Sequence, residues 1–482
     1  MMRYISTRGQ APAVSFLDAV LAGLAPDGGL YVPESWPVLF ADEAARKSAA
    51  NGHYAVTASV ALKAFAGDDL TAEEVAALAT DAYISPPRSA NEHWSPPWPE
   101  TVTPLRHIGP GQWILELFHG PSLSFKDVAM QLIGPLYDLA LTKRGRRLSV
   151  VCATSGDTGG AAVEALKGRD RVDLFVLLPK GRVSDVQRFF MTASGAANVH
   201  AIEIDGDFDA CQAIVKSLFA DQSFAAQASL SGVNSINWAR IVAQSVYYHV
   251  ASEALAAHGP VNFAVPTGNF GDAFSGWVAK QCGAPVGKIL IATNANDILA
   301  RTLETGRYER AAHSHATLSP AMDIQVASNF ERILFEALDR DGGAVRALYA
   351  SFAQSGGFDI PKPALDKLRA DFDAAAVSDE ETRHSMRVGW SAGDEAHVVC
   401  PHTAVALRAL SKTVTLIDAP IVTLATAHPA KFPDTVEAAT GVRAKLPAKC
   451  ADLFEREEKS DVLANDAQAV KRYIQERSRA WS

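Results

Sequence analysis

A chain of 482 residues is longer than one ordinary hydrophobic core supports, so two or three domains are expected. With 48% hydrophobic and 21% charged residues, the composition excludes a disordered or collagen-like chain. The 45 Lys and Arg residues are outnumbered by 54 Asp and Glu residues. The resulting net charge of −9 and the lack of any basic run argue against nucleic acid as a partner.

The cysteine pattern and the apolar runs indicate the compartment. The five cysteines are scattered without Cys-x-x-Cys spacing, which indicates neither a zinc site nor a disulfide framework and fits a reducing cytosol. No run of 18 apolar residues occurs, and the first residues, MMRYISTRG, lack a signal-peptide pattern. We therefore expect a soluble, cytoplasmic protein that spans no membrane. The sequence leaves the oligomeric state open between monomer and homodimer.

The first hundred residues have the pattern of a small, mostly helical domain. Apolar residues recur at helical spacing over 13–24, and Thr71 with Glu74 forms a capping-box pattern before another helix. Prolines then crowd the stretch 86–104, which we interpret as a domain boundary. This predicts an N-terminal domain over residues 1–100 that carries no constellation of reactive groups.

Beyond this boundary, short apolar runs alternate with amphipathic segments, which is typical of βα units around a largely parallel sheet. The predicted strands are 148–153, 172–178, 199–204, 261–265, 288–292 and 421–425. The predicted helices are 185–194, 208–220, 238–256, 273–281 and 402–410. An exposed amphipathic helix is expected over 462–474, and the stretch 340–395 is polar and irregular with helical pieces.

Lys126 lies in the segment LFHGPSLSFKD, at the start of a predicted helix. It follows a Gly-Pro turn, and the apolar residues after it recur at helical spacing. A lysine held there beside Phe125 and Met130 can be partly desolvated, which lowers the pKa of its amine and makes the neutral, nucleophilic form available. Most lysines are instead solvated surface charges, so the segment alone leaves both interpretations open.

Two turns after predicted strands are rich in glycine and small polar residues. The first is TSGDTGG at 154–160, whose N–H groups and hydroxyls would face a ligand at the sheet edge. The second is PTGNFGD at 266–272, in which several N–H groups can converge on a phosphate. Each is alternatively an ordinary turn before a capped helix, with Asp157 or Thr158 as the cap in the first and Asp272 in the second.

The segment TAHPAKF at 426–432 forms a third polar strand end, where Thr426 would emerge at the edge of the sheet. We interpret His428, which precedes a proline, as a packed or capping histidine in preference to a catalytic base, and His402 in the same way. His313 and His315 alternate as in a strand or loop, and no third ligand of suitable type is near them. The sequence therefore predicts no metal site.

Two glycine-rich turns and a lysine at a helix start are the groups that a protein needs to bind a phosphorylated aromatic cofactor and to bond to it covalently. The segments around them resemble the threonine synthase family, whose members are pyridoxal-phosphate enzymes of fold type II, as is the β subunit of tryptophan synthase. The resemblance spans nearly the whole chain, in order. It is carried by YISTRG, PDGGLYVP, FHGPSLSFKD, ATSGDTGGAA, SINWARI, PTGNFGD, SPAMDIQVASNFER and TAHPAKF.

The resemblance implies an α/β fold, with two α/β domains of mostly parallel sheet beside the small N-terminal domain. Residues 101–482 would form the catalytic region. Within it, a smaller α/β subdomain over about 148–255 would be inserted in a larger one.

The resemblance also implies residue roles. Lys126 would bond covalently to pyridoxal phosphate, Asp157 would face the edge of the cofactor ring, and the hydroxyl of Thr426 would face the ring nitrogen. The cofactor phosphate would be held by Gly268, Asn269, Phe270, Gly271 and Asp272.

The implied reaction converts O-phosphohomoserine and water to threonine and phosphate, by γ-elimination and β-addition of water, with Lys126 moving protons. Candidates for binding this small anionic substrate are Thr154, Ser155, Asn237 and Arg240. Arg240 matches phosphate oxygens in pairs but is equally an ordinary surface arginine of a helix.

One departure and two alternatives remain. Family members often have an acidic residue where Cys400 precedes Pro-His-Thr, which leaves the role of His402 open. The alternatives are a phospholyase or dehydratase of the same fold that releases a keto acid, and a paralogue that binds pyridoxal phosphate without catalysis.

Overall fold

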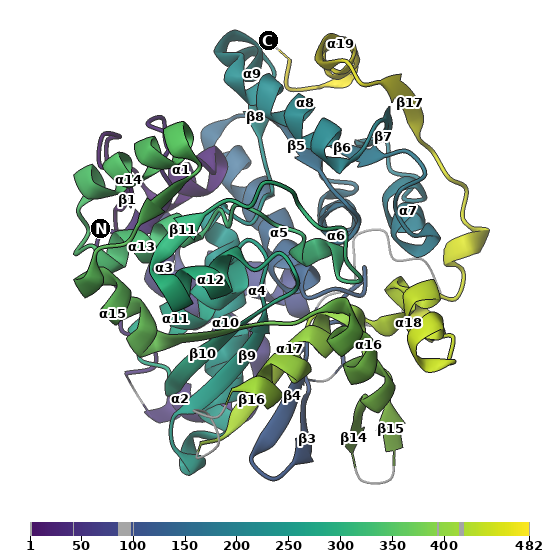
Figure 1. The fold of residues 1–482 in the computed structure, drawn as a ribbon. Coiled ribbons are helices and arrows are strands. Elements are labelled where there is room, and N and C mark those ends of the chain that lie inside the picture. The colour runs from purple at the N-terminus through teal and green to yellow at the C-terminus, as the bar shows by residue number, and fades with distance from the viewer. Residues whose placement is uncertain are drawn as a thin grey trace.

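The computed structural model of the chain describes residues 2–41, 43–84, 98–99, 101–392, 395–413 and 419–481. Two sheets of mainly parallel strands organise these residues, and helices surround both of them (Figure 1). In the view of Figure 1 the smaller sheet lies in the upper part of the molecule and the larger sheet below it. The α/β class predicted from the sequence is confirmed.

The smaller sheet has the strand order β17-β7-β6-β5-β8, and all of its pairings are parallel. Its strands are β5 (Leu148–Ala153), β6 (Val172–Pro179), β7 (Val199–Asp205), β8 (Leu230–Ser231) and β17 (Asp461–Ala464). The helices beside it are α6 (Asp157–Leu166), α7 (Asp185–Thr192), α8 (Phe208–Ala220) and α9 (Gln222–Gln227). Strand β6 is buried along its whole length, as expected of a parallel strand covered on both faces.

The larger sheet has the order β13-β10-β9-β16-β4-β3, in which only the pairing of β3 with β4 is antiparallel. Its strands are β3 (Leu105–Gly109), β4 (Gln112–Glu116), β9 (Val261–Pro266), β10 (Val286–Thr293), β13 (Phe372–Ala376) and β16 (Ile421–Ala425). The helices that lead from or towards its strands include α5 (Lys126–Arg144), α10 (Trp238–Ala254), α11 (Gly271–Gln281), α16 (Asp379–Val388) and α17 (Pro401–Lys412).

The N-terminal region is helical, as predicted. It contains β1 (Tyr4–Ser6), α1 (Phe16–Ala22), β2 (Tyr31–Pro33), α2 (Glu43–Ala50), α3 (Tyr54–Ala66) and α4 (Ala72–Tyr83). The capping box of Thr71 and Glu74 is confirmed at the start of α4. These elements share one hydrophobic core with α5 and α10. The boundary placed in the proline-rich stretch stays a prediction, because residues 85–97 and 100 lie outside the described residues.

The remaining elements include those of the stretch 340–395, for which the sequence predicted only helical pieces. They are α12 (Ile298–Thr305), β11 (Arg307–Glu309), α13 (Phe330–Ala337), α14 (Gly342–Ser355), β12 (Gly357–Asp359), α15 (Lys362–Asp371), β14 (Trp390–Ala392), β15 (Glu395–His397), α18 (Pro433–Thr440) and α19 (Ala467–Arg477). None of the helices in the described part of the chain combines the length and hydropathy needed to cross a lipid bilayer.

The prediction of one exposed helix over 462–474 is wrong. Its first residues form β17, which pairs with β7 at the edge of the smaller sheet, next to α19 in Figure 1. Helix α19 begins only at Ala467, because the side chain of Asp466 accepts hydrogen bonds from the N–H groups of the first helical turn. The helix buries Val470 and Ile474 in the core beside the smaller sheet. The segment 461–477 therefore belongs to the smaller sheet and its core, with β17 as an edge strand and α19 packed beside it.

Candidate active site

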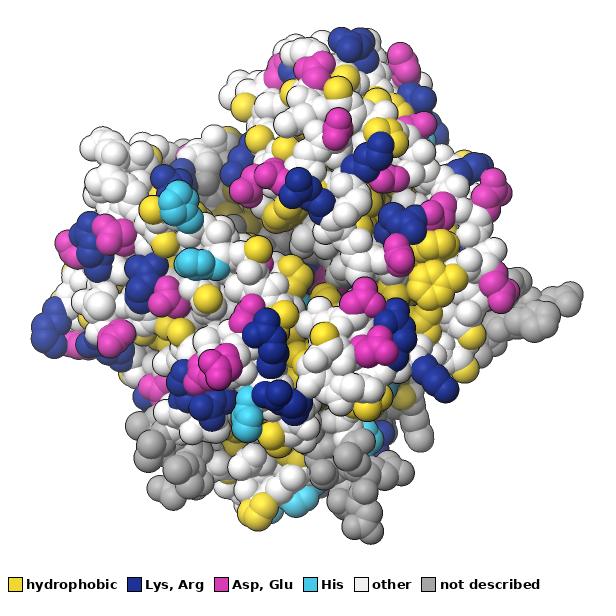
Figure 2. Space-filling model, turned by 45° about the vertical axis from the view of Figure 1, so that its right-hand side comes forward, with side chains coloured by type: hydrophobic (Ala, Val, Ile, Leu, Met, Phe, Trp, Pro, Cys, Tyr) yellow, Lys and Arg dark blue, Asp and Glu magenta, His cyan; other side chains and the backbone are white. Residues whose placement is uncertain are grey.

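A cavity of about 970 Å³ lies between the two sheets. Its walls come from the segments that follow β5, β9 and β16, from the start of α5, and from the loop 310–328. Figure 2 shows that the surface is hollowed below the upper part of the molecule, which contains the smaller sheet. Because the carboxyl ends of parallel strands meet at one edge of a sheet, residues from distant parts of the chain face one another across this space.

Lys126 is the first residue of α5 and lines the cavity. Its position is fixed from the neighbouring strand end, because the N–H of Phe125 donates to the carbonyl oxygen of Thr426 at 2.8 Å. The Nζ atom lies 3.5 Å from Oδ2 of Asp157 and 4.7 Å from the ring centre of Phe125. Burial lowers the pKa of Lys126, and the positive charges of Arg240 and Lys431 act in the same direction, against the attraction of Asp157. The desolvated amine predicted from the sequence is thus present.

Asp157 is buried at the start of α6 and contacts three side chains. Besides Lys126, these are Lys431, whose Nζ lies 2.9 Å from Oδ1, and Gln187, whose Nε2 donates to the same oxygen at 3.1 Å. Burial alone would raise the pKa of Asp157, but the two lysines outweigh it and hold the pKa well below its usual range. Neither Asp157 nor Thr158 caps the helix, because the cap position belongs to Gly156.

The segment 266–272 forms a tight turn into α11. Phe270 adopts a left-handed conformation with φ of 63°, and a Cβ atom on Gly268 would come within 2.8 Å of the carbonyl oxygen of Ala321. Within the described part of the chain, the N–H groups of residues 268–272 donate no hydrogen bond. Free N–H groups at a helix start attract an anion, so this turn has the properties of a phosphate site.

Asp272 is not the cap of α11, since that position belongs to Phe270. Its Oδ1 atom accepts hydrogen bonds from the hydroxyls of Tyr247 and of Tyr248, the latter at 2.9 Å. Burial raises the pKa of Asp272 to about 6. This carboxyl group therefore ties the turn to α10.

Arg240 is only 3% exposed and lines the cavity, so its interpretation as a surface arginine is wrong. Its guanidinium donates a hydrogen bond from Nη1 to the carbonyl oxygen of Val233 at 3.3 Å, and its buried Nε has no partner among the residues that the structure describes. Burial lowers the pKa of Arg240 to about 10. Thr154 and Ser155 line the same cavity. These three residues can meet an anionic ligand.

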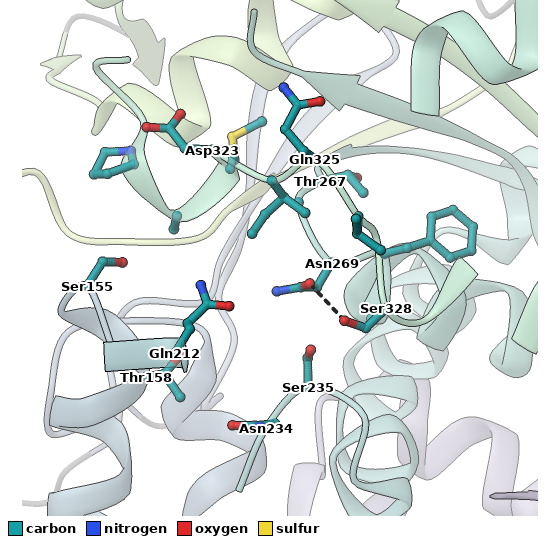
Figure 3. Close-up of a pocket in the computed structure, with 18 of the residues that line it drawn as sticks. Ser155, Thr158, Gln212, Asn234, Ser235, Thr267, Asn269, Asp323, Gln325 and Ser328 are labelled. Atoms are coloured by element: carbon teal, nitrogen blue, oxygen red, sulfur yellow. Dashed lines mark hydrogen bonds between the residues drawn. The ribbon is translucent and has the colours of Figure 1, made fainter. Parts of the chain in front are cut away.

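Asn237 does not line the cavity. Its side chain caps α10 and donates to the carbonyl oxygen of Val20 at 2.8 Å and to the hydroxyl of Tyr137 at 2.9 Å. The polar residues that do line the wall at this point are its neighbours Asn234 and Ser235, which Figure 3 shows below the turn that carries Asn269. Beside Asn269, the hydroxyl of Ser328 donates to the Oδ1 atom of Asn269 at 3.3 Å.

The two histidines have different surroundings. His402 lines the cavity, its Nε2 accepts a hydrogen bond from the N–H of Ala321 at 3.2 Å, and burial lowers its pKa to about 4. His428 caps the short 3-10 helix Pro429–Lys431 with its Nδ1, which confirms the capping interpretation. Among the described residues, no cluster of three His, Cys, Asp or Glu side chains is arranged to hold a metal ion.

Sequence reasoning missed Lys431 and Asn329. Lys431 is fully buried and pairs with Asp157, and Asn329 donates its N–H to the carbonyl oxygen of Asn269 at 3.0 Å. Both lie in segments that carried the family resemblance, TAHPAKF and SNFER. No local pattern marks their partners, which are far away in the sequence.

These groups fit a phosphorylated aromatic aldehyde. An accessible, desolvated amine is available to react with a carbonyl group, the free N–H groups of residues 268–272 can hold a phosphate, and Thr426 offers a hydroxyl at the end of β16.

Comparisons with known proteins agree with a site for pyridoxal phosphate. Residues 99–354 match the family model described as "Pyridoxal-phosphate dependent enzyme". Residues 3–83 match "Threonine synthase N terminus" and residues 403–474 match "Threonine synthase, C-terminal".

Relatives align over the full length. The threonine synthase of Pseudomonas aeruginosa is 46% identical over 475 residues, which cover 98% of each chain. The crystal structure of pyridoxal-phosphate-bound threonine synthase from Brucella melitensis has a TM-score of 0.91, with 47% identity and full coverage of both chains. The crystal structure of the yeast threonine synthase has a TM-score of 0.88, with 34% identity over 98% of each chain.

Fold and site together define a pyridoxal-phosphate-dependent enzyme of fold type II. The similarity over all three matched segments narrows this class, and the chain belongs to the threonine synthase family.

Proposed function

We propose that this protein converts O-phosphohomoserine and water to threonine and phosphate, the last step of threonine biosynthesis. The observation that carries the proposal is the amine of Lys126, which is desolvated beside Asp157 and opens on the same cavity as the free N–H groups of residues 268–272. The family membership and the full-length similarity to threonine synthases support it.

The cofactor supplies an electron sink for negative charge that develops on the carbon beside the substrate amine. In this proposal Lys126 is both the attachment point of the cofactor and, once released, the base that takes the proton from Cα at its Nζ atom. A second proton leaves Cβ, the bond between Cγ and the phosphate oxygen breaks, and a proton is returned to Cγ, which becomes the methyl group of threonine. Water then adds its hydroxyl at Cβ, and Cα takes up a proton again before threonine is released. Atoms balance as one phosphate released for each water consumed.

Residues of the chain would hold the two charged ends of the ligands. The turn 268–272 would bind the cofactor phosphate, and the hydroxyl of Thr426 would face the ring nitrogen. We assign the substrate phosphate to Arg240, Thr154 and Ser155, because a buried guanidinium with an unpartnered Nε is a strong donor for phosphate oxygens. Asn237 is left out of this set, since its side chain is used by the cap of α10.

A cytoplasmic location is part of the proposal. The five cysteines are all buried and unpaired, which fits a reducing compartment. The substrate class that the cavity favours is a small anionic amino acid, because Arg240 is buried there and polar side chains line the walls.

Product analysis tests the reaction. Incubated with O-phosphohomoserine, the purified protein should form threonine and phosphate in equal amounts, and 2-oxobutyrate as the sole product would instead show the phospholyase alternative. A wild-type protein that takes up no pyridoxal phosphate would contradict an enzymatic role altogether. Lys126→Ala should abolish threonine formation, while Lys362→Ala, at an exposed position of α15, should leave it unchanged.

A further inference from the structure

Lys431 is a buried lysine beside the reactive one. It belongs to the short 3-10 helix Pro429–Lys431 and has no exposed surface. Its Nζ donates to the carbonyl oxygen of Ser122 at 2.7 Å, lies 2.9 Å from Oδ1 of Asp157, and sits 5.6 Å from the ring centre of Phe190. A fully buried lysine is rare in proteins, and when one occurs it is paired.

Asp157 consequently stands between two lysines. Its Oδ1 faces Lys431 and its Oδ2 faces Lys126, the latter at the longer distance of 3.5 Å. Gln187 supplies one further donor to Oδ1. The closer partner of the carboxylate is therefore the lysine that does not open on the cavity, as Lys431 is not among its lining residues.

The charged groups around Lys126 determine how easily its amine loses a proton. The titratable or charged groups that face it are Asp157 on α6, Lys431, Arg240 on α10, His402 on α17 and Asp272 on α11. If Lys126 were the only cation next to Asp157, each loss of its proton would leave a buried carboxylate unpaired, which is costly. The proton would then stay on Lys126.

We propose that Lys431 is a positioning residue that supplies the permanent counter-charge of Asp157, so that the amine of Lys126 can lose its proton or engage the cofactor without leaving the carboxylate unpaired. The inference rests on the role proposed for Lys126. Lys431 also fixes the segment before Lys126, since Ser122 bonds with its backbone N–H and its hydroxyl to Asp127.

The test measures the amine of Lys126 directly in the full-length protein freed from pyridoxal phosphate. The rate of acetylation of Lys126 by acetic anhydride is followed against pH by mass spectrometry, with exposed Lys362 in the same sample as reference. Lys431→Met should raise the pH midpoint of this reaction by at least about one unit, because a cation that disfavours the protonated amine is removed.

A second comparison applies if Lys431→Met does not fold. Lys431→Gln, whose side-chain amide can still donate to the carbonyl oxygen of Ser122, should raise the midpoint in the same way, whereas the double variant Asp157→Asn/Lys431→Gln should return it towards the wild-type value, because no buried carboxylate is then left unpaired. A midpoint that does not rise in the folded Lys431 variant, or that is equal in the Lys431→Gln single and double variants, would overturn the proposal. Labelling does not require threonine to be formed, so its result is separate from that of the product assay.

Discussion

Asn329 donates both its backbone N–H and its side-chain amide to the carbonyl oxygen of Asn269, at 3.0 and 3.2 Å. The same amide donates to the carbonyl oxygen of Ser235 at 3.1 Å, and Oδ1 accepts from Arg332. Arg332 in turn donates from Nε to the carbonyl oxygen of Tyr31 at 3.0 Å. A continuous chain of hydrogen bonds thus runs from the N-terminal region to the turn that we assign to the cofactor phosphate.

Asn329→Ala should therefore weaken cofactor binding. The variant keeps the bond from its backbone N–H to Asn269 but loses the side-chain bonds to Asn269, Ser235 and Arg332, which costs about 1–3 kcal/mol, and part of this cost falls on the order of the turn. We expect the Kd for pyridoxal phosphate to rise roughly tenfold or more in equilibrium titrations. Asn465→Ala, at an exposed position before α19, is the matched control. An unchanged Kd would show that the turn holds its shape without Asn329.

Gly268→Ala should be harmful for a steric reason. The added Cβ would lie 2.8 Å from the carbonyl oxygen of Ala321 and 3.1 Å from Cγ1 of Ile324, so the turn and the loop 310–328 must move apart. Cofactor affinity measured by titration should fall while the far-ultraviolet circular dichroism stays unchanged. Gly109→Ala is the control, because a Cβ at that position meets nothing within 4 Å. Equal affinities of the two variants would contradict the steric account.

Thr426→Val tests the hydroxyl assigned to the ring nitrogen. Valine keeps the shape and removes one hydrogen-bonding group, so kcat should fall about tenfold, which corresponds to roughly 1.4 kcal/mol. Cofactor content, measured by absorbance, should not change. Thr423→Val, on β16 just before Thr426, is a matched control, because the buried hydroxyl of Thr423 has no partner in the described part of the chain. Loss of activity in the control but not in Thr426→Val would contradict the assignment.

The pH dependence of stability has a source outside the site. His249 on α10 is fully buried against Phe40, and burial lowers its pKa to about 3. The unfolded chain therefore takes up a proton on this residue below pH 6.5 while the folded chain does not, so the histidine destabilises the fold as the pH falls from 6.5 towards 3. Between pH 6.5 and 5.0 this loss amounts to about 2 kcal/mol.

His249→Phe should remove this part of the slope. The free energy of unfolding, measured with urea at pH 6.5 and 5.0, should fall less in the variant than in the wild type. A variant with the same pH slope as the wild type would mean that His249 does not remain neutral in the folded chain. Burial alone lowers the pKa of His249, so replacing the histidine should remove the whole of this effect.

Much of the fold follows from local sequence signals. The predicted strands of both sheets are confirmed within one or two residues because buried parallel strands appear as short apolar runs between helical segments. The sequence also points to Lys126 and the glycine-rich turns as candidate site residues, since each lies at the junction of a strand or turn with a helix, and the structure places them around one cavity. Pairings between distant segments have no such signal. Strand β17 forms by pairing with β7, which lies far away in the sequence. Lys431 can be buried because its amine pairs with Asp157 and donates a hydrogen bond to the carbonyl oxygen of Ser122.

For Asn237, in contrast, the sequence carries a clear local signal, but the predicted role in substrate binding does not follow it. The residue directly precedes a long apolar helix, where asparagine commonly caps the first turn. The structure shows this cap, with the side chain accepting from the N–H of Ala239. The sequence thus carries a local capping signal at Asn237, which the prediction of a substrate-binding role does not take into account.

Formation of threonine from O-phosphohomoserine in water enriched with oxygen-18 is the most direct test of the proposed reaction. In the proposed reaction the Cγ–O bond breaks and water adds at Cβ, so threonine should carry one labelled oxygen, in its hydroxyl group, and the released phosphate should be unlabelled. Labelled phosphate, or 2-oxobutyrate as the sole organic product, would contradict it.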